Sequence, residues 1–139
     1  MKRIEIKTKE YKMLNAGEDA VLYTRNLNEE LAFSFFSSKL KKVALSRNID
    51  KYQLVELLKE MNPNNIQEPG LIRVQIIGGL ANSVATVQYL KHLIEEFVLV
   101  DNNRNIINIV SLDTGARLHP NSFEVDCYHG GVRAMVLNE

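Results

Sequence analysis

The chain has 139 residues, of which 45% are hydrophobic and 24% are charged, a composition typical of a globular domain rather than a disordered segment. This length fits one domain, and we expect a single domain over residues 1–139. The 17 basic and 17 acidic residues cancel, so the net charge provides no general attraction for a nucleic acid or an anionic membrane. We therefore expect neither as a partner.

The single cysteine, Cys127, excludes an internal disulfide and with it a disulfide-stapled secreted domain. Near the N-terminus, residues 3–7 alternate apolar and charged side chains, unlike the apolar centre of a signal peptide. No apolar run approaches the roughly 18 residues needed to cross a bilayer. These observations predict a cytoplasmic protein.

Alternating side chains predict several strands in the first third of the chain. In residues 31–36, the odd positions Leu31, Phe33 and Phe35 are large and apolar, whereas the even positions are mixed. This segment therefore has one strongly apolar face, and a polar loop over residues 25–29 precedes it. The strands expected here are 3–7 and 11–14, which form a pair, followed by 20–24, 31–36 and 42–46.

Two segments have helical periodicity. The first begins after Asp50, a suitable N-cap, and ends near Met61, where the run 62–65 with its proline stops it. Its apolar residues recur at i, i+3, i+4 and i+7: Leu54, Leu57, Leu58 and Met61. The second helix begins at Asn82 or Ser83 and reaches about Phe97.

The second half of the chain adds further strands, and the number of strands and helices then predicts the fold class. A strand over 71–76 runs into Gly78 and Gly79, where the glycines allow close backbone packing or a bend. With about eight strands, two helices are too few to cover both faces of a sheet, so we expect a mixed α/β domain in which one helical layer covers two β layers. The remaining expected segments are a strand at 106–112, a polar connection at 113–121, and a hairpin of 122–128 and 132–137 across 129–131.

Four short segments occur in the order found in a known family. They are Lys9-Glu10-Tyr11, Leu22-Tyr23-Thr24, Ile76-Ile77-Gly78-Gly79, and Asp113-Thr114-Gly115 followed by Arg117. In this order, and in its glycine positions, the chain resembles the CheD family of chemoreceptor glutamine deamidases from about residue 4 to residue 137. The resemblance implies a layered α/β/β sandwich and a role related to chemotaxis.

The resemblance also implies a site, but with altered chemistry. In the family, a thiolate attacks a glutamine side chain to form a thioester, a histidine acts as acid and base, and a threonine organises the site. Here the threonine position corresponds to Thr24, the nucleophile position falls in 28–30, most naturally at Glu30, and the histidine position falls at Arg47. A carboxylate is a poor acyl-forming nucleophile, and arginine accepts no proton near neutral pH. We expect a catalytically inactive relative that acts as a protein-interaction or regulatory module without a cofactor.

A second group of residues offers an alternative. Cys127 and His129 lie two positions apart near a strand end, and with His119 they would form a relocated site of a cysteine hydrolase or deamidase. The other interpretation is that Cys127 is a small buried hydrophobe and His129 a turn residue. Three such residues are too few for a structural zinc site, which needs four ligands.

Two interpretations also remain open for each of two further groups of polar residues. Asp113, Thr114 and Arg117 follow an apolar strand and form either a turn or the rim of a binding cleft. Glu30 and Arg47 form either a structural ion pair or part of a cleft that recognises a peptide or ligand. The expected partner is an unidentified protein, and the sequence is also compatible with a homo-oligomer.

Overall fold

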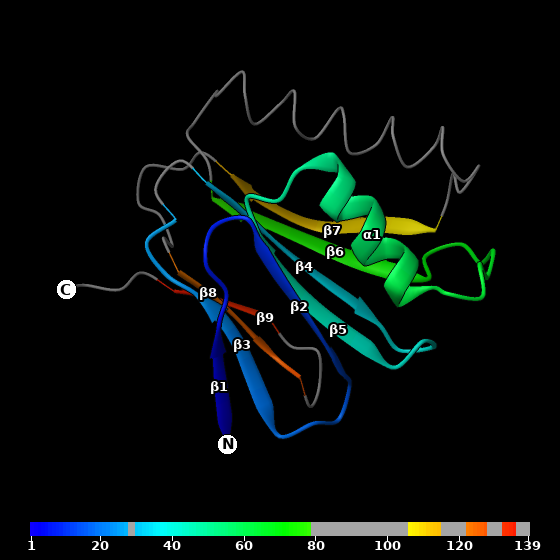
Figure 1. The fold of residues 1–139 in the computed structure, drawn as a ribbon, viewed down its shortest axis with the longest axis horizontal. Coiled ribbons are helices and arrows are strands. Elements are labelled where there is room, and N and C mark those ends of the chain that lie inside the picture. Colours follow the sequence, from blue (N-terminus) through cyan, green and yellow to red (C-terminus); the bar gives the residue numbers. More distant parts are fainter. Residues whose placement is uncertain (28–29, 79–105, 115–121, 128–131, 136–139) are drawn as a thin grey trace.

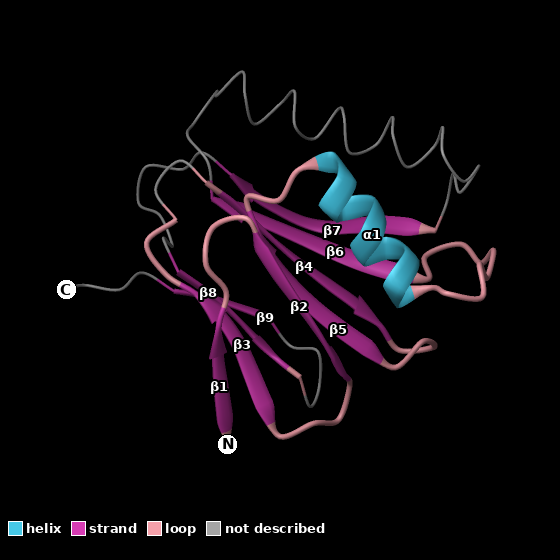
Figure 2. Cartoon of the chain, viewed as in Figure 1, coloured by secondary structure: helices cyan, strands magenta, loops and turns pink. Residues whose placement is uncertain are grey.

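The computed structural model describes residues 1–27, 30–78, 106–114, 122–127 and 132–135. Within these residues, one helix and nine strands are arranged in three layers (Figures 1 and 2). The helix packs on one face of a five-stranded sheet, and a four-stranded sheet packs on the other face. The predicted mixed α/β class is therefore confirmed. The predicted helix at 82–97 lies outside the described residues.

The four-stranded sheet, called the small sheet, has the strand order β1-β3-β8-β9. β1 (Lys2–Glu5) runs parallel to β3 (Ala20–Thr24). On the other side of β3, the antiparallel hairpin of β8 (Ser122–Asp126) and β9 (Val132–Met135) completes the sheet. The strand over 20–24 and the hairpin pairing thus agree with the sequence-based expectation.

The five-stranded sheet, called the large sheet, has the strand order β2-β5-β4-β6-β7. Neighbouring strands are antiparallel except for β6 and β7, which are parallel and carry a register shift between Val74 and Gln75. The strands are β2 (Glu10–Asn15), β4 (Leu31–Ser37), β5 (Lys42–Arg47), β6 (Ile72–Gly78) and β7 (Ile107–Thr114).

Two expectations from the sequence were wrong. The strands expected at 3–7 and 11–14 both exist, but β1 and β2 lie in different sheets and do not pair with each other. The chain crosses between the sheets at Ile6, whose side chain is buried in the core between them. Asp113 and Thr114, expected at the start of a polar connection, belong to β7, because parallel pairing with β6 continues to Gly78.

Helix α1 (Lys51–Met61) forms for the reasons visible in its sequence. The Asp50 side chain accepts a hydrogen bond from the Gln53 backbone N–H (2.8 Å), and the Gln53 side chain accepts one from the Asp50 N–H (3.2 Å). This capping box satisfies backbone donors at the helix N-terminus. The helix ends at Met61, and its C-cap Asn62 directly precedes Pro63.

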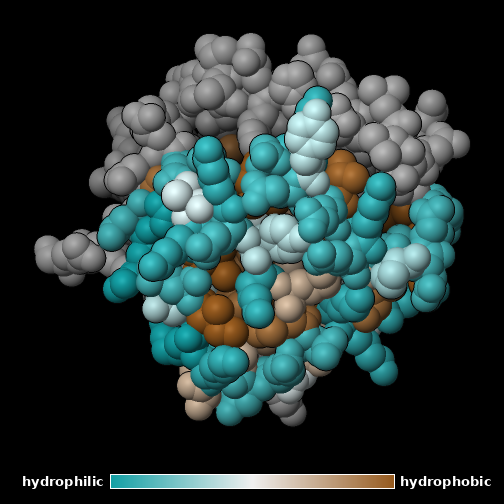
Figure 3. Space-filling view, viewed as in Figure 1, coloured by the Kyte–Doolittle hydropathy of each residue, from teal (hydrophilic) through white to brown (hydrophobic). Residues whose placement is uncertain are grey.

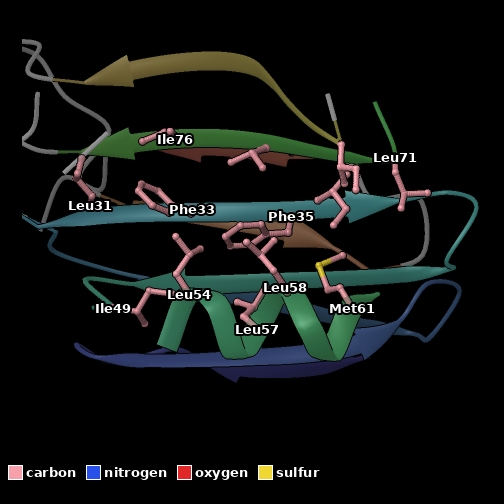
Figure 4. Packing of buried hydrophobic residues seen from close by; sticks show 14 residues of the cluster. Leu31, Phe33, Phe35, Ile49, Leu54, Leu57, Leu58, Met61, Leu71 and Ile76 are labelled. Atoms are coloured by element: carbon pink, nitrogen blue, oxygen red, sulfur yellow. The ribbon is translucent and has the colours of Figure 1, made fainter. Parts of the chain in front are cut away.

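The middle strand β4 separates two hydrophobic cores. Its odd-numbered residues face α1, where Phe33 and Phe35 meet edge to face with ring centroids 6.3 Å apart. Figure 4 shows the apolar side chains of α1 facing those of the large sheet. Ala32, on the opposite face of β4, belongs to the core between the sheets. The four apolar helix residues predicted from the sequence are all buried.

The outer surface is mostly polar where it is described. On the face shown in Figure 3, hydrophilic residues cover most of the described surface, with smaller apolar areas between them. Among the described residues, Met1 and Tyr52 are the large hydrophobic residues that are exposed, each by 74%. No helix in this part of the chain has the length and apolar character needed to span a bilayer.

Gly78→Ala should destabilise the fold far more than Gly17→Ala, although the two glycines have nearly equal φ values of +102° and +99°. A Cβ at Gly78 would overlap the carbonyl oxygen of Glu30, whereas a Cβ at Gly17 has no atom within 4 Å. We expect the free energy of unfolding, measured by urea denaturation, to fall by about 1 kcal/mol for Gly17→Ala and by at least about 3 kcal/mol for Gly78→Ala. Equal losses of unfolding free energy in the two variants would contradict the close approach of the Gly78 and Glu30 backbones.

Candidate functional site

The residues that the family resemblance selects lie together at one end of the sandwich. Thr24 is the last residue of β3 in the small sheet, and Arg47 is the last residue of β5 in the large sheet. Residues 25–30 connect the sheets and lead into β4. Gly78 ends β6 opposite Leu31, so it closes the same end of the large sheet.

The guanidinium group of Arg47 joins these elements. Its Nη1 donates hydrogen bonds to Thr24 Oγ1 (3.1 Å) and to the carbonyl oxygen of Arg25 (2.6 Å). Its Nη2 donates to the carbonyl oxygen of Asn26 (3.0 Å) and to Glu30 Oε1 (3.0 Å). Only 13% of the side chain is exposed. We call this arrangement the Arg47 clamp, because one cation holds the connecting loop and both sheets.

Glu30 is the anionic partner within the clamp. One carboxylate oxygen binds Arg47, and the other accepts a hydrogen bond from the hydroxyl of Thr8, in the turn between β1 and β2. The Glu30 backbone N–H also donates to the carbonyl oxygen of Leu27 (2.8 Å), which closes the loop on itself. The structure therefore confirms an ion pair between Glu30 and Arg47.

Thr24 is fully buried and uses its hydroxyl group twice. Its Oγ1 donates to the carbonyl oxygen of Ile6 (2.7 Å) and accepts from Arg47. Thr24 is therefore a strand-end residue whose hydroxyl group is bonded to the backbone. Since its one donor is committed to Ile6, the hydroxyl has no proton left to donate to a substrate.

The chemistry of the clamp is structural. A guanidinium group holds its proton throughout the physiological pH range, so Arg47 cannot act as a general base. The Glu30 carboxylate is bound on both oxygens, by Arg47 and by Thr8. Breaking a pair of this kind by removing one partner is costly, because the remaining charge is left in a partly dehydrated position. The arrangement holds the carbonyl groups of Arg25 and Asn26 and the carboxylate of Glu30 in place.

The sheet register brings the predicted binding residues Asp113 and Thr114 to the same end. Arg47 is opposite Ala32, Ala32 is opposite Ile77, and Ile77 is opposite Asp113. These four residues form one cross-strand row, in which the backbones of Arg47 and Asp113 are about 14 Å apart at the usual strand spacing. Arg117 lies outside the described residues.

Cys127 lies in the core between the sheets, on the small sheet just beyond β8. The residue is fully buried, and its backbone N–H donates to the carbonyl oxygen of Ala20 (3.0 Å). Burial, together with the nearby carboxylates of Glu18 and Asp126, raises the pKa of the Cys127 thiol to about 11. The expectation that Cys127 is a small buried hydrophobe is confirmed.

The histidines of the alternative site, His119 and His129, lie outside the described residues. In the part of the chain that the structure describes, no three metal-ligating side chains are grouped in a way that could hold a metal ion. Thr8 is the member of the site that sequence reasoning missed. It is 22 residues from Glu30, so no local pattern could signal the contact, although it directly precedes the Lys9-Glu10-Tyr11 segment of the resemblance.

Arg47→Met should destabilise the protein much more than Arg25→Met. Arg25 forms a comparable pair with Glu5 (3.5 Å), but 48% of its side chain is exposed, against 13% for Arg47. We expect urea denaturation to show a loss of about 3 kcal/mol for Arg47→Met and less than about 1 kcal/mol for Arg25→Met. Similar small losses in both variants would show that the clamp does not hold the loop.

Cys127 should be nearly inert in the folded protein. At about pH 8, a rise of the thiol pKa from 9.0 to about 11 reduces the thiolate fraction, and hence the alkylation rate, about a hundredfold. We expect mass spectrometry to show iodoacetamide labelling at least about a hundredfold slower in the folded chain than in urea. Equal rates would contradict both the burial and the raised pKa.

Comparison with known proteins gives one relative and no family description. No protein-family model matches the chain. Over 68 residues, the chain is 50% identical to a protein of Rickettsia conorii named "Uncharacterized protein RC0132". The aligned region covers 49% of this chain and 89% of the relative. The chain therefore belongs to the same family as this uncharacterised Rickettsia conorii protein.

Proposed function

We propose that this protein is a CheD-like scaffold that has lost amide-cleaving chemistry and acts as a protein-interaction or regulatory module. The three-layer arrangement supports the proposal, because it places one helix and two sheets in the order that the resemblance implies. The clustering of Thr24, Glu30 and Arg47 at one end of the sheets supports it further. Arg47 is 17 residues from Glu30 and 23 residues from Thr24 in the sequence, and the resemblance assigns all three to one site.

The observation that carries the proposal is the bonding of Arg47. Glutamine deamidation needs a nucleophile that forms an acyl intermediate and a group that donates a proton to the leaving ammonia. The resemblance assigns Arg47 to the position of the proton-transfer group, yet its four hydrogen bonds are all donated to oxygen acceptors within the chain. At Glu30, attack on an amide would have to give an anhydride, and the carboxylate is held by Arg47 and Thr8.

The same bonding suits a surface that binds a partner. Arg25, Asn26 and Glu30 are held by hydrogen bonds from β5, and Glu30 also by one from the turn between β1 and β2. Groups that are already held in place lose little conformational entropy when they bind a partner. The end of the sandwich is therefore preorganised for recognition, although the groups needed for deamidation are absent from its clamp.

An ammonia-release assay tests the loss of chemistry. The purified chain is incubated with a glutamine-containing cytoplasmic fragment of a bacterial chemoreceptor, and ammonia is followed with a glutamate dehydrogenase coupled reaction. We expect no release above the protein-free blank. Arg47 is not suited to transfer the proton, and Glu30 is a poor nucleophile for attack on the amide. A catalytically competent CheD-family enzyme serves as the positive control.

Two variants identify the source of any activity. Release of ammonia that disappears in Cys127→Ser would support the relocated thiol enzyme with His119 or His129 and would refute the proposal. Release that disappears in Glu30→Gln but persists in Cys127→Ser would assign a nucleophilic role to the carboxylate, and would refute it as well. The burial of Cys127 and its raised pKa weigh against the first outcome.

A further inference from the structure

The edge strand β2 pairs on one side with β5, and on its other side no strand of the described residues pairs with it (Figure 1). The backbone groups of such an edge are a template for pairing with another chain. The strand begins at the Arg47 clamp, since Glu10 is opposite Arg47 in the large sheet. The following inference rests on the proposed interaction function and adds the surface and the chemistry of the partner.

The hydrogen bonds of β2 determine which of its backbone groups point outward. Ala16, which follows β2, donates its N–H to the carbonyl oxygen of Lys41 (2.9 Å) and so continues the ladder with β5. In an antiparallel ladder, alternate residues bond to the neighbouring strand, so the even-numbered residues of β2 bond to β5. The N–H and carbonyl groups of Tyr11 and Met13 therefore point toward the open edge. We call these four groups the β2 gap.

Hydrogen bonds close the open edge at both ends of the β2 gap. At one end, the Lys9 N–H donates to the carbonyl oxygen of Arg47 (2.7 Å), and the Lys9 carbonyl accepts from the Gln53 side chain (2.8 Å). At the other end, the Asn15 N–H donates to the Glu18 carboxylate (2.8 Å), and the Asn15 carbonyl accepts from the Glu18 N–H (3.3 Å). The four groups between these ends have no hydrogen-bond partner within the described residues.

The side chains of β2 set the chemistry that an added strand would meet. Tyr11 and Met13 are half-buried against the core beneath α1, whereas Leu14 packs against the core between the sheets. Since side chains alternate along a strand, Glu10 and Lys12 are on the same face as Leu14, and both are exposed. An added strand would therefore meet apolar side chains on one face, and an anion and a cation two residues apart on the other.

A second copy of β2 fits the β2 gap poorly. A two-fold dimer pairs the strands antiparallel, and filling both gaps would pair Tyr11 of each copy with Met13 of the other. The two Lys12 side chains would then lie directly opposite each other, where like charges destabilise the pairing. A shift of two residues in either direction would need backbone groups of Lys9 or Asn15, which are already bonded.

We propose that the β2 gap binds an extended segment of a partner protein as an added antiparallel strand, with an acidic residue opposite Lys12 and a basic residue opposite Glu10. The residues of the segment opposite Tyr11 and Met13 exchange backbone hydrogen bonds with them, and apolar side chains there extend the core beneath α1. From the position opposite Leu14 onward, the segment reads apolar, apolar, acidic, apolar, basic. Backbone bonds supply affinity in this mode of binding, and the alternate side chains supply specificity.

Two peptides of identical composition test this register. Both carry fluorescein and Gly-Ser flanks. The matched peptide has the central run Leu-Val-Glu-Val-Lys, and in the swapped peptide the glutamate and the lysine exchange places. We expect fluorescence anisotropy at low salt to show about tenfold weaker binding of the swapped peptide, because two cross-strand attractions become repulsions. Since the two peptides have equal net charge, general electrostatic attraction would give equal binding.

A charge exchange in the protein provides the reverse test. In the double variant Glu10→Lys with Lys12→Glu, we expect the swapped peptide to bind about tenfold more tightly than the matched peptide. A gain of binding for one peptide cannot result from unfolding of the variant. Lys41→Glu is the control, because Lys41 is also exposed but lies in the turn between β4 and β5. It should change either affinity by about twofold or less.

N-methylation of the matched peptide separates strand addition from side-chain contact. Methylation of the valine opposite Tyr11 removes an N–H that points into the β2 gap, whereas methylation of the glutamate opposite Lys12 removes one that points away. We expect the first change to weaken binding at least about tenfold and the second about threefold or less.

Four results would overturn the proposal. The first three are no binding of the matched peptide, equal affinities of the matched and swapped peptides, and equal effects of the two methylations. The fourth is a dimer of the unaltered chain in sedimentation that the matched peptide does not dissociate, which would assign the β2 gap to a second copy. None of these results would affect the proposed loss of deamidation, which the ammonia assay measures independently.

Discussion

The hydrogen bonds of the Arg47 guanidinium group are the constraint on which this end of the molecule depends. A cation that is only 13% exposed must recover the hydration it has lost. The two terminal nitrogens of Arg47 do so through a hydroxyl, two backbone carbonyls and a carboxylate, whereas its buried Nε has no hydrogen-bond partner within the described residues. Asn26, whose carbonyl oxygen is one of these acceptors, has a left-handed backbone with φ of +55°.

The position of the Arg47 clamp depends on β4, because this strand is packed on both of its faces. One face of this strand packs Phe33 and Phe35 against α1, and the other contributes Ala32 to the core between the sheets. The strand therefore cannot shift without disturbing both cores. Gly78 allows the end of β6 to lie directly against the carbonyl group of Glu30, so the residue that pairs with Arg47 is positioned from the backbone as well. The site is rigid for reasons of packing as much as of charge.

Local patterns predicted most of the fold. Alternation identified β3, β4 and β5 nearly to the residue, and the Asp50 cap with its helical apolar spacing identified α1. The pairing of β1 was mispredicted, because alternation reveals which residues face a core but not which sheet a strand joins. The end of β7 was also misplaced, since Asp113 and Thr114 are polar and only pairing with β6 keeps them in the strand.

The sequence by itself determined the three layers, because periodicity and capping are properties of residues and short segments. Only the tertiary structure decided which groups Arg47 and Glu30 contact. The contacts of Arg47 with Thr24 and of Glu30 with Thr8 each span more than twenty residues of sequence. They exist because two sheets, formed from interleaved parts of the chain, bring their strand ends together at one place.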